Sequence, residues 1–505
     1  MNGKLVGIIV CVVVLLSLGG VMLFLKKTAP KDGQESSQVQ EEHDHDHDDE
    51  EEASIIVLGR ESEEISSVHV VNGSGEFDVT RTIDTSGTPD ITVPQLSGIS
   101  QNSVTKNGMF TIAGMLEAYK LVEEDAPEVA KYGLEEPAAQ FTVTYNDGEE
   151  RTLYIGDEVP NNERYMYVRL ADEKNVYMML ASKMSYFLDP VTAYVNLALI
   201  SEPDNDNWPE YGKEVITRSD WDYEVTFEND PNNVEGMISS QVISSPIFAY
   251  LNITGSTDVT HGMWGLAAEE CVEVKPDEET LAGYGLDEPR CTVSLKGEGY
   301  DYLLKVGDQL FSEAGENEVA ELLGYYCTVE GIDGRDCVYL VSESNLPWVT
   351  FKIEDVITTI MLPNYLVDLD TIDIEANGEV STFEITSNGT SKELNEDGSA
   401  AAVTSVKYEG RELAVDNFKT FYQFVMTCPT DELCFDEPEG DYVVKVTEHQ
   451  KDGGTMSIEL YKDTARRYIV KLNGKASYRI PSTWADTLLE DLENVKVDGA
   501  IKDSY

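Results

Sequence analysis

The residues of this chain best suited to chemistry lie near its amino end, where three histidines, His43, His45 and His47, alternate with aspartates and run into Asp48–Glu52. Imidazole nitrogens and carboxylate oxygens are both competent ligands for zinc or nickel. A dedicated metal site also needs rigid geometry and outer hydrogen bonds, which a charged stretch without apolar periodicity lacks. Two interpretations stay open: a solvated spacer, which we favour, and a loose metal-collecting tail.

Six of the seven cysteines lie beyond residue 53 and follow one another as three sequence-adjacent pairs. Cys327 and Cys337 flank Gly331–Gly334 symmetrically, so a hairpin there would bring them opposite each other and predicts a disulfide. Cys428 and Cys434 are a second candidate pair. Neither spacing is that of a zinc knuckle, and no histidine lies beside them.

The remaining histidines, His69, His261 and His449, are far from one another in sequence and belong to no catalytic motif. The chain lacks a Gly-x-Ser-x-Gly elbow, a His-Glu-x-x-His helix, and the Walker and dinucleotide fingerprints. We therefore predict no catalytic residue and no cofactor, and a protein that is not an enzyme. Any nucleotide used in its pathway would be hydrolysed by another chain.

The formal net charge is −59, from 95 Asp and Glu against 36 Lys and Arg. A surface this acidic repels phosphate backbones and anionic head groups, which argues against nucleic-acid binding and peripheral membrane binding. Hydrophobic residues still make up 41% of the chain, enough for about three domains with buried cores.

An apolar run over residues 5–25 matches the thickness of a bilayer and predicts a single transmembrane anchor. Residues 1–4 would be a cytoplasmic tail, and residues 26–53 a disordered stalk rich in His, Asp and Glu. The lysines on both sides of the run do not decide the orientation. The residues after the stalk, which we call the body, contain an even number of cysteines, and this favours a disulfide-permissive compartment. We therefore expect a single-pass cell-membrane protein whose body is extracytoplasmic.

Beyond the stalk, the chain repeats itself. Tyr132-Gly-Leu-Glu-Glu-Pro137 recurs as Tyr284-Gly-Leu-Asp-Glu-Pro289 and, more faintly, as Phe435-Asp-Glu-Pro438, and an alternating strand pattern follows each time. These repeats predict an α+β fold of three tandem units, 54–200, 201–365 and a divergent 366–505. Each would hold an antiparallel strand meander packed by amphipathic helices, including helices over 112–122 and 418–425.

The shared motif has a structural explanation. Gly133 and Gly285 are expected to end a helical turn in the left-handed conformation, with an apolar contact from Leu134 and Leu286. Pro137 and Pro289 would then prevent the helix from continuing. Tyr132 and Tyr284 complete the motif, which we interpret as a fold signal and not as a ligand site.

The motif, followed by Tyr154-Ile-Gly-Asp157, Tyr165-Met-Tyr-Val-Arg169 and Val176-Tyr-Met178, resembles the bacterial domain-of-unknown-function family 4340. The resemblance implies a membrane-anchored accessory subunit that accompanies ABC transporters of the gliding-motility and export type. It implies no catalytic residues. The expected partners are therefore the membrane and an ABC permease with its ATPase, with a small-molecule or polymer cargo that the sequence does not identify.

Two alternatives remain at this stage. One is an independent cell-surface binding or adhesion module for cell-wall polymer. The other, less favoured, is a hydrolase with a cryptic carboxylate site.

Overall fold

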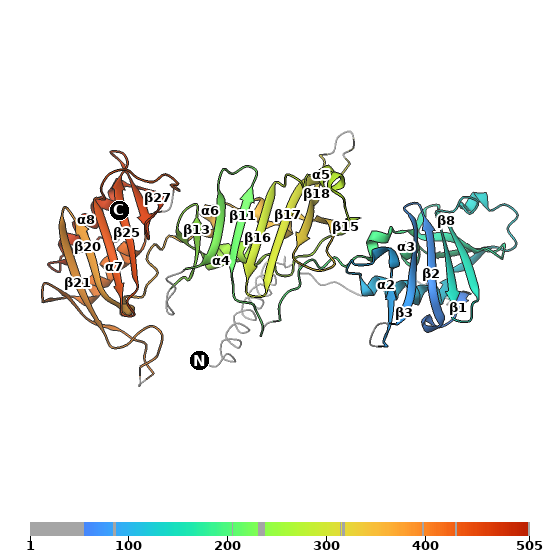
Figure 1. Cartoon of the computed structure of the whole chain (residues 1–505), viewed down its shortest axis with the longest axis horizontal. Coiled ribbons are helices and arrows are strands. Elements are labelled where there is room, and N and C mark those ends of the chain that lie inside the picture. Colours follow the sequence, from blue (N-terminus) through green and yellow to red (C-terminus); the bar gives the residue numbers. More distant parts are fainter. Residues whose placement is uncertain are drawn as a thin grey trace, which may run out of the picture. The chain divides into compact units, whose positions relative to one another are not determined.

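A computed structural model describes residues 55–83, 87–204, 206–230, 238–313, 315, 319–395, 398–429 and 432–502 (Figure 1). These residues form mainly antiparallel sheets with a few short helices, which confirms the predicted α+β class in this coarse form. Within the described ranges, no helix has the length and apolar character needed to cross a bilayer. The predicted tail, anchor and stalk, residues 1–53, lie outside them.

The first large sheet has eight strands in the order β4-β3-β2-β7-β8-β9-β10-β6. Its central pair, β2 and β7, places Val68 opposite Val143 and Val70 opposite Phe141, all of them buried. The strands are β2 (Ile65–Asn72), β3 (Gly75–Ile83), β4 (Pro89–Thr92), β6 (Lys120–Glu123), β7 (Ala139–Tyr145), β8 (Glu150–Val159), β9 (Asn162–Leu170) and β10 (Val176–Leu180).

Two helices and a small second sheet accompany this first sheet. Helix α2 (Ser103–Gly114) begins at Asn102, whose side chain accepts hydrogen bonds from the N–H groups of Val104 and Thr105. Helix α3 (Ala181–Leu188) follows β10, and Phe187 stacks on Phe141 at 3.8 Å between ring centroids. Strands β1 (Ile55–Gly59) and β5 (Met115–Ala118) form the small sheet.

The helix predicted over residues 112–122 is therefore wrong. Helix α2 ends at Gly114, and the residues that follow become β5 and β6, which pair with β1 and β10. A Cβ at Gly114 would lie 2.8 Å from the carbonyl oxygen of Arg60, so the backbones of these two segments approach closely. Strand pairing with distant segments overrides the local apolar spacing.

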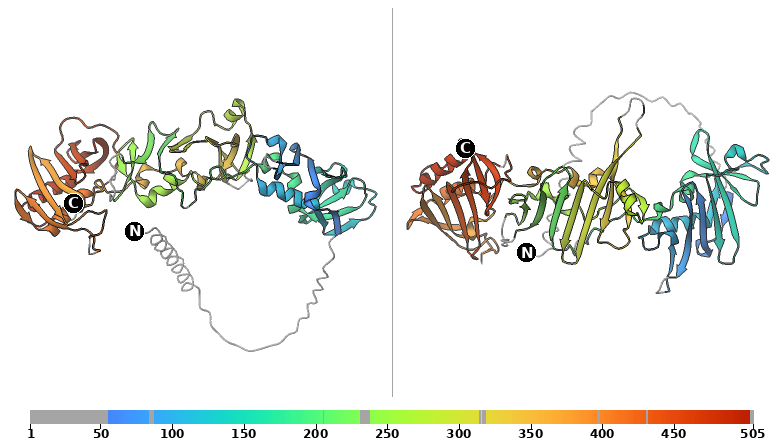
Figure 2. Two further views of the ribbon diagram at one scale, coloured as in Figure 1. Left: turned by 60° about the horizontal axis from the view of Figure 1, so that its bottom comes forward. Right: turned by 45° about the horizontal axis from the view of Figure 1, so that its top comes forward.

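The second sheet has nine strands in the order β14-β13-β12-β11-β16-β17-β18-β19-β15 (Figure 2). Helix α4 (Ile253–His261) has Asn252 as its N-cap, and α5 (Glu278–Gly283) precedes β16. The strands are β11 (Lys213–Arg218), β12 (Glu224–Asn229), β13 (Gln241–Ser245), β14 (Ala249–Tyr250), β15 (Glu270–Val274), β16 (Cys291–Gly297), β17 (Tyr300–Phe311), β18 (Leu322–Glu330) and β19 (Cys337–Val341).

The third sheet has eight strands in the order β23-β22-β21-β20-β24-β25-β26-β27. Helix α7 (Val415–Met426) buries Phe418, Phe421, Tyr422 and Val425, as their spacing predicts, and α8 (Ser482–Val495) buries Trp484, Leu488 and Leu492. The strands are β20 (Leu369–Ala376), β21 (Glu379–Ser387), β22 (Val403–Tyr408), β23 (Arg411–Leu413), β24 (Val444–Gln450), β25 (Thr455–Lys462), β26 (Arg467–Leu472) and β27 (Lys475–Pro481).

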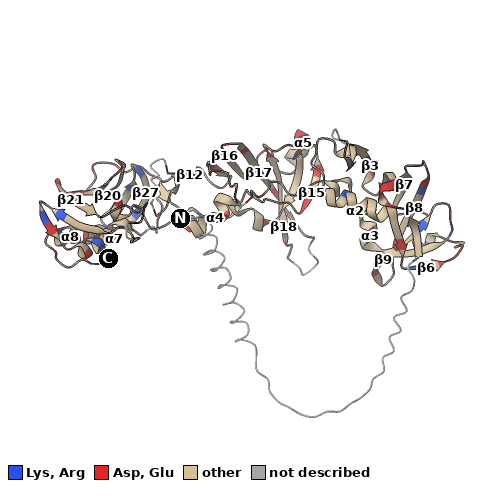
Figure 3. Ribbon diagram, turned by 90° about the horizontal axis from the view of Figure 1, so that it is seen from below, with Lys and Arg blue, Asp and Glu red and all other residues tan. Residues whose placement is uncertain are grey.

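Acidic side chains occur on strands and loops of all three large sheets (Figure 3). Many of them are ion-paired, such as Asp147, whose carboxylate lies 2.8 Å from the Arg60 guanidinium. Arg60 holds the pKa of Asp147 below its usual value.

Candidate functional site

The repeated Tyr-Gly-Leu motif has the same geometry in the first two sheets. Gly133 and Gly285 both have φ of 68°, in the left-handed region that favours glycine. In the second copy, the N–H of Asp308 donates to the carbonyl oxygen of Tyr284 at 2.9 Å. A Cβ at Gly285 would lie 2.8 Å from the Asp308 carboxyl carbon, and one at Gly133 would overlap the Asp157 carboxylate.

The tyrosines of the motif rest on a neighbouring strand. The Tyr132 ring packs against Tyr167 at 4.8 Å, and the Tyr284 ring packs against Tyr326 at 4.6 Å. The hydroxyl of Tyr132 donates to Glu123 Oε2 at 2.7 Å. Leu134 and Leu286 are buried. In both copies, the motif is a closely packed junction between a turn and the Gly-Asp segment of a strand.

The predicted pairing of Cys327 with Cys337 is wrong. Strands β18 and β19 are neighbours, but their register places Cys327 opposite Tyr339, two residues along the strand from Cys337. Cys271, Cys291, Cys327, Cys337 and Cys434 are free thiols, and there is no disulfide between Cys428 and Cys434. The turn at Gly331–Gly334 is not symmetric about the two cysteines, because β19 starts only at Cys337.

The histidines are dispersed. His69 Nδ1 lies 2.9 Å from Asp78 Oδ1, and His449 Nε2 lies 3.0 Å from Asp373 Oδ2. His261 is half-buried, and this burial lowers its pKa. His43, His45 and His47 fall outside the described residues. Where the structure does describe the chain, it brings no three His, Cys, Asp or Glu side chains together as a metal site.

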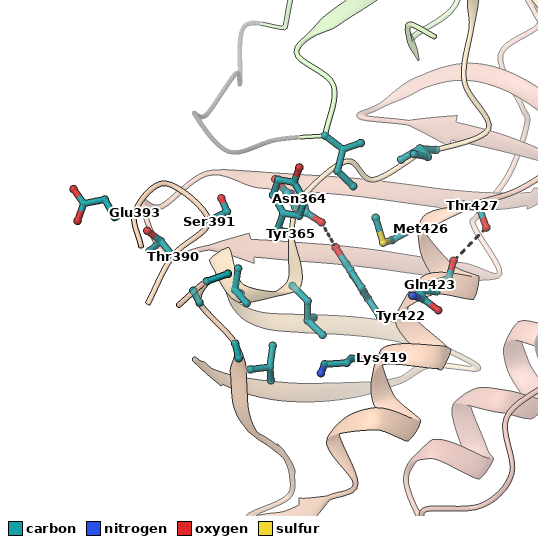
Figure 4. Close-up of a pocket in the computed structure, with 18 of the residues that line it drawn as sticks. Asn364, Tyr365, Thr390, Ser391, Glu393, Lys419, Tyr422, Gln423, Met426 and Thr427 are labelled. Carbon is teal, nitrogen blue, oxygen red and sulfur yellow. Dashed lines mark hydrogen bonds between the residues drawn. The ribbon is translucent and has the colours of Figure 1, made fainter. Parts of the chain in front are cut away.

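A cavity of about 830 Å³ lies against the third sheet, between helix α7 and the segments that flank β20 and β22 (Figure 4). Its walls are largely apolar, and Thr390, Ser391 and Glu393 lie at one side of it. A volume of this size can hold a small organic molecule. The apolar walls include Ile360, Leu366, Val367, Leu394, Ala401, Val403 and Met426.

Polar groups converge where Asn364 and Tyr422 line this cavity. The Asn364 side chain donates to Glu448 Oε2 at 2.7 Å and accepts from the Gln450 side chain at 2.9 Å. The Tyr422 hydroxyl lies 2.9 Å from the backbone carbonyl oxygen of Asn364 and 2.7 Å from Glu448 Oε1. Glu448 comes from β24 and is fully buried.

The Tyr422 hydroxyl has two acceptors within hydrogen-bonding distance, the backbone carbonyl of Asn364 and the carboxylate of Glu448. Its single proton can serve only one of these two oxygens fully. A proton on Glu448 would let both short contacts of the hydroxyl be satisfied together. Burial raises the pKa of Glu448 to about 7, although the bonds from Asn364 and Tyr422 act in the opposite direction.

A second buried glutamate occupies the centre of the second sheet. Glu214 on β11 accepts from the Tyr211 hydroxyl at 3.0 Å and from Trp348 Nε1 at 2.8 Å. Burial raises its pKa to about 8, again against the effect of these two donors. Each carboxylate oxygen of Glu214 therefore accepts one hydrogen bond from a neighbouring side chain.

The comparisons with known proteins bear on the first sheet. Residues 94–206 match the family model described as Domain of unknown function (DUF4340). Over these residues the chain is similar to that family. No curated protein and no solved structure matches the chain.

The DUF4340 segment contains α2, β5–β10, α3 and the Tyr132–Pro137 motif, which agrees with the residues that suggested the family. The cavity and both buried glutamates lie outside it. Sequence reasoning missed Glu214 and Glu448, although a signal existed: Glu448 is in phase with Val444 and Val446 on an alternating strand, at a position expected to face the core.

Proposed function

We propose that the chain is a non-enzymatic, membrane-anchored extracytoplasmic accessory subunit of an ABC-type, gliding-motility or export-like transport system. The observation that carries this proposal is the DUF4340 match over residues 94–206, since this is the family whose resemblance implies such a role. The apolar run at residues 5–25 supports the anchor. Confinement to the membrane surface raises the effective concentration of a neighbouring permease, so even a weak contact would be occupied.

We also propose that the three large sheets are tandem copies of one unit. In each sheet, the strands that come first in sequence form one half and a later antiparallel meander forms the other half. The two halves meet at one central antiparallel strand pair, which is β2–β7, β11–β16 or β20–β24. Each has a helix, α2, α4 or α7, in the segment between these two halves. Asn102 and Asn252 cap the first two of these helices in the same way.

The cavity on the third sheet supplies a binding surface for this role. Its walls are largely apolar, with Thr390, Ser391 and Glu393 at one side, an arrangement that suits recognition of a mainly apolar ligand by shape. Its occupant would be the cargo or an apolar segment of the permease.

The partner proposal is tested by crosslinking in native membranes, mild solubilisation and identification of what co-purifies with the full-length chain. We expect an ABC permease and its ATPase, with a lower yield when residues 1–53 are deleted. The purified body alone should hydrolyse no ATP. Repeated recovery of wall polymer or self-contacts, with no transport component, would contradict the proposal.

One observation favours the alternative of an adhesion module. On the first sheet, Tyr119 is 53% exposed and packs against Tyr165 at 4.8 Å between ring centroids. Exposed aromatic rings can stack on sugar faces in a wall polymer. Under this alternative, Tyr119→Ala would reduce sedimentation of the protein with purified cell wall in the absence of any transporter, whereas under the transport proposal it would not.

A further inference from the structure

The cavity of the third sheet exposes large apolar side chains to water. Leu394 and Tyr365, which both line it, are 63% and 42% exposed. Apolar groups exposed in a concave surface favour a ligand that removes them from water. The cavity volume of about 830 Å³ falls within the range of about 300–1,000 Å³ that is usual for small-molecule sites. These observations indicate a small ligand with a large apolar part.

One wall of the cavity comes from a connection that is much longer in the third sheet than in the first. Residues 388–402 join β21 to β22, whereas residues 84–88 join β3 to β4. The long connection is fixed at its base, where the N–H of Ala402 donates to the Asn388 side chain at 2.7 Å. Its residues, Leu394 among them, line the cavity. The cavity therefore depends on a segment that has no counterpart of equal length in the first sheet.

Helix α7 places polar side chains along the edge of the cavity. Lys419 and Gln423 both line it, and they lie on one face of the helix because they are four residues apart. The lysine ammonium offers three N–H donors and a positive charge, and the glutamine amide offers two further donors. Together they are suited to an acceptor-rich head group.

The charge that faces the cavity is positive. Among the described residues that line it, Glu393 and Lys419 are charged. Figure 4 shows the Lys419 ammonium pointing in among the lining residues and the Glu393 carboxylate pointing away from them. Lys419 also lies 3.5 Å from Asp416, but this carboxylate is almost fully exposed, so the pair contributes little.

The acidic charge of the whole chain does not decide which head group binds here. At physiological ionic strength, exposed charges that are more than about 8 Å apart are largely screened from each other. A head group in contact with Lys419 therefore interacts mainly with that ammonium group. The contact attracts a carboxylate, which also accepts charge-assisted hydrogen bonds, and it repels an amine cation.

We propose that the cavity binds a single-chain carboxylate amphiphile of the fatty-acid class, with its head group at Lys419 and Gln423 and its hydrocarbon chain against the apolar walls. This inference rests on the proposed role of the cavity as a binding surface, and it selects a small ligand over a segment of the permease. The head group fixes the orientation of the ligand, and the apolar walls recognise the chain by its shape.

The test is photo-crosslinking of the full-length protein in phosphatidylcholine nanodiscs, followed by peptide mapping. The probes are dodecanoic acid, dodecanol and dodecylamine, each with a diazirine near the end of its chain. At equal concentration, the acid should label residues within 360–367, 390–403 or 415–427 at least five-fold more than the amine does, with the alcohol between them. An acid that labels no better than the alcohol, a preference for the amine, or labelling confined to other residues would overturn the proposal.

Substitutions at Lys419 separate its charge from its bulk. Lys419→Met keeps a long, helix-forming side chain, so it should lower labelling by the acid at least five-fold and leave labelling by the alcohol unchanged. Lys419→Glu should make the amine the preferred probe. Lys462→Met, at an exposed position on β25, is the matched control and should change neither signal. An unchanged acid signal in Lys419→Met would also overturn the proposal.

The result is independent of the co-purification experiment. Acid-selective labelling without recovery of a permease and its ATPase would contradict the accessory-subunit proposal and support the ligand class. Recovery of the permease and ATPase without a preference for the acid would contradict the ligand class alone.

Discussion

The Tyr422 hydroxyl lies 2.7 Å from Glu448 Oε1, and both side chains are buried beneath the cavity of the third sheet. The same hydroxyl lies 2.9 Å from the backbone carbonyl oxygen of Asn364, and burial raises the pKa of Glu448 to about 7, which favours the neutral acid below that pH. The cluster therefore couples the wall of a cavity to a group that titrates near neutral pH.

This coupling predicts a pH-dependent stability. Glu448 has a pKa of about 7 in the folded protein against an ordinary 4.5, so the folded state binds the proton more tightly than the unfolded chain. The stabilising effect is fully present below about pH 4.5 and is lost as the pH rises to about 7, with an upper limit of about 3 kcal/mol. In Glu448→Gln, whose amide imitates the neutral acid, the free energy of unfolding should fall less between pH 5 and pH 8 than in the wild type.

Urea unfolding followed by circular dichroism at both pH values measures this difference. Glu412→Gln, on the exposed edge strand β23, controls for the general effect of removing one of many acidic groups. An equal pH dependence in Glu448→Gln and the wild type would show that Glu448 does not titrate in this range.

Trp348→Phe tests the buried glutamate of the second sheet. It removes the N–H that donates to Glu214 Oε1 at 2.8 Å and to the Val259 carbonyl at 3.0 Å. Loss of a donor to a buried acceptor costs about 1–3 kcal/mol. Because this donor lowers the pKa of Glu214, its loss should destabilise the protein more at pH 9, where the carboxylate is ionised, than at pH 6.

The free energy of unfolding at these two pH values is the measurement, with Trp208→Phe, at a 42% exposed position, as the control. A pH-independent loss would mean that Trp348 contributes only packing.

The cost of replacing the glycine of the Tyr-Gly-Leu motif has two parts, the strain of a left-handed backbone and a close contact of the new Cβ. Gly133→Ala should destabilise the first sheet, because alanine at φ of 68° is strained by about 1–2 kcal/mol and its Cβ also overlaps the Asp157 carboxylate. Gly148 has φ of 88° and open space where a Cβ would lie, so Gly148→Ala carries the strain alone. The melting temperature of Gly133→Ala should be lower than that of Gly148→Ala. Equal melting temperatures would show that the close contact with Asp157 does not contribute to the loss of stability.

Local sequence patterns predicted much of the fold. The predictions that failed have a common cause. The alternating pattern that follows the first Tyr-Gly-Leu motif predicted a strand, which is β7, and the apolar spacing over 418–425 predicted α7. The apolar spacing over 112–122 failed because β5 and β6 pair with strands far away in sequence. The Cys327–Cys337 pairing failed for a related reason, since register is decided by the whole sheet and not by symmetry about a turn.

The candidate site was less predictable than the fold. Glu448 could have been noticed as a charge in phase with buried valines, but its partners come from a loop, at Asn364, and from a helix, at Tyr422. Their convergence depends on how α7 packs against β24, which no local pattern encodes. The cavity beside them has no sequence signature at all.

The cavity itself should bind a neutral apolar probe. Nile red added to the purified body should gain fluorescence, because the walls are apolar and the volume of about 830 Å³ accommodates a dye of this size. In Ala401→Trp, an indole fills part of the cavity, and the dissociation constant should rise at least five-fold. Val380→Trp places the same side chain at a position that is 60% exposed on β21 and should leave binding unchanged. Equal affinity for the wild type and both variants would place the dye elsewhere and leave the cavity without a demonstrated ligand.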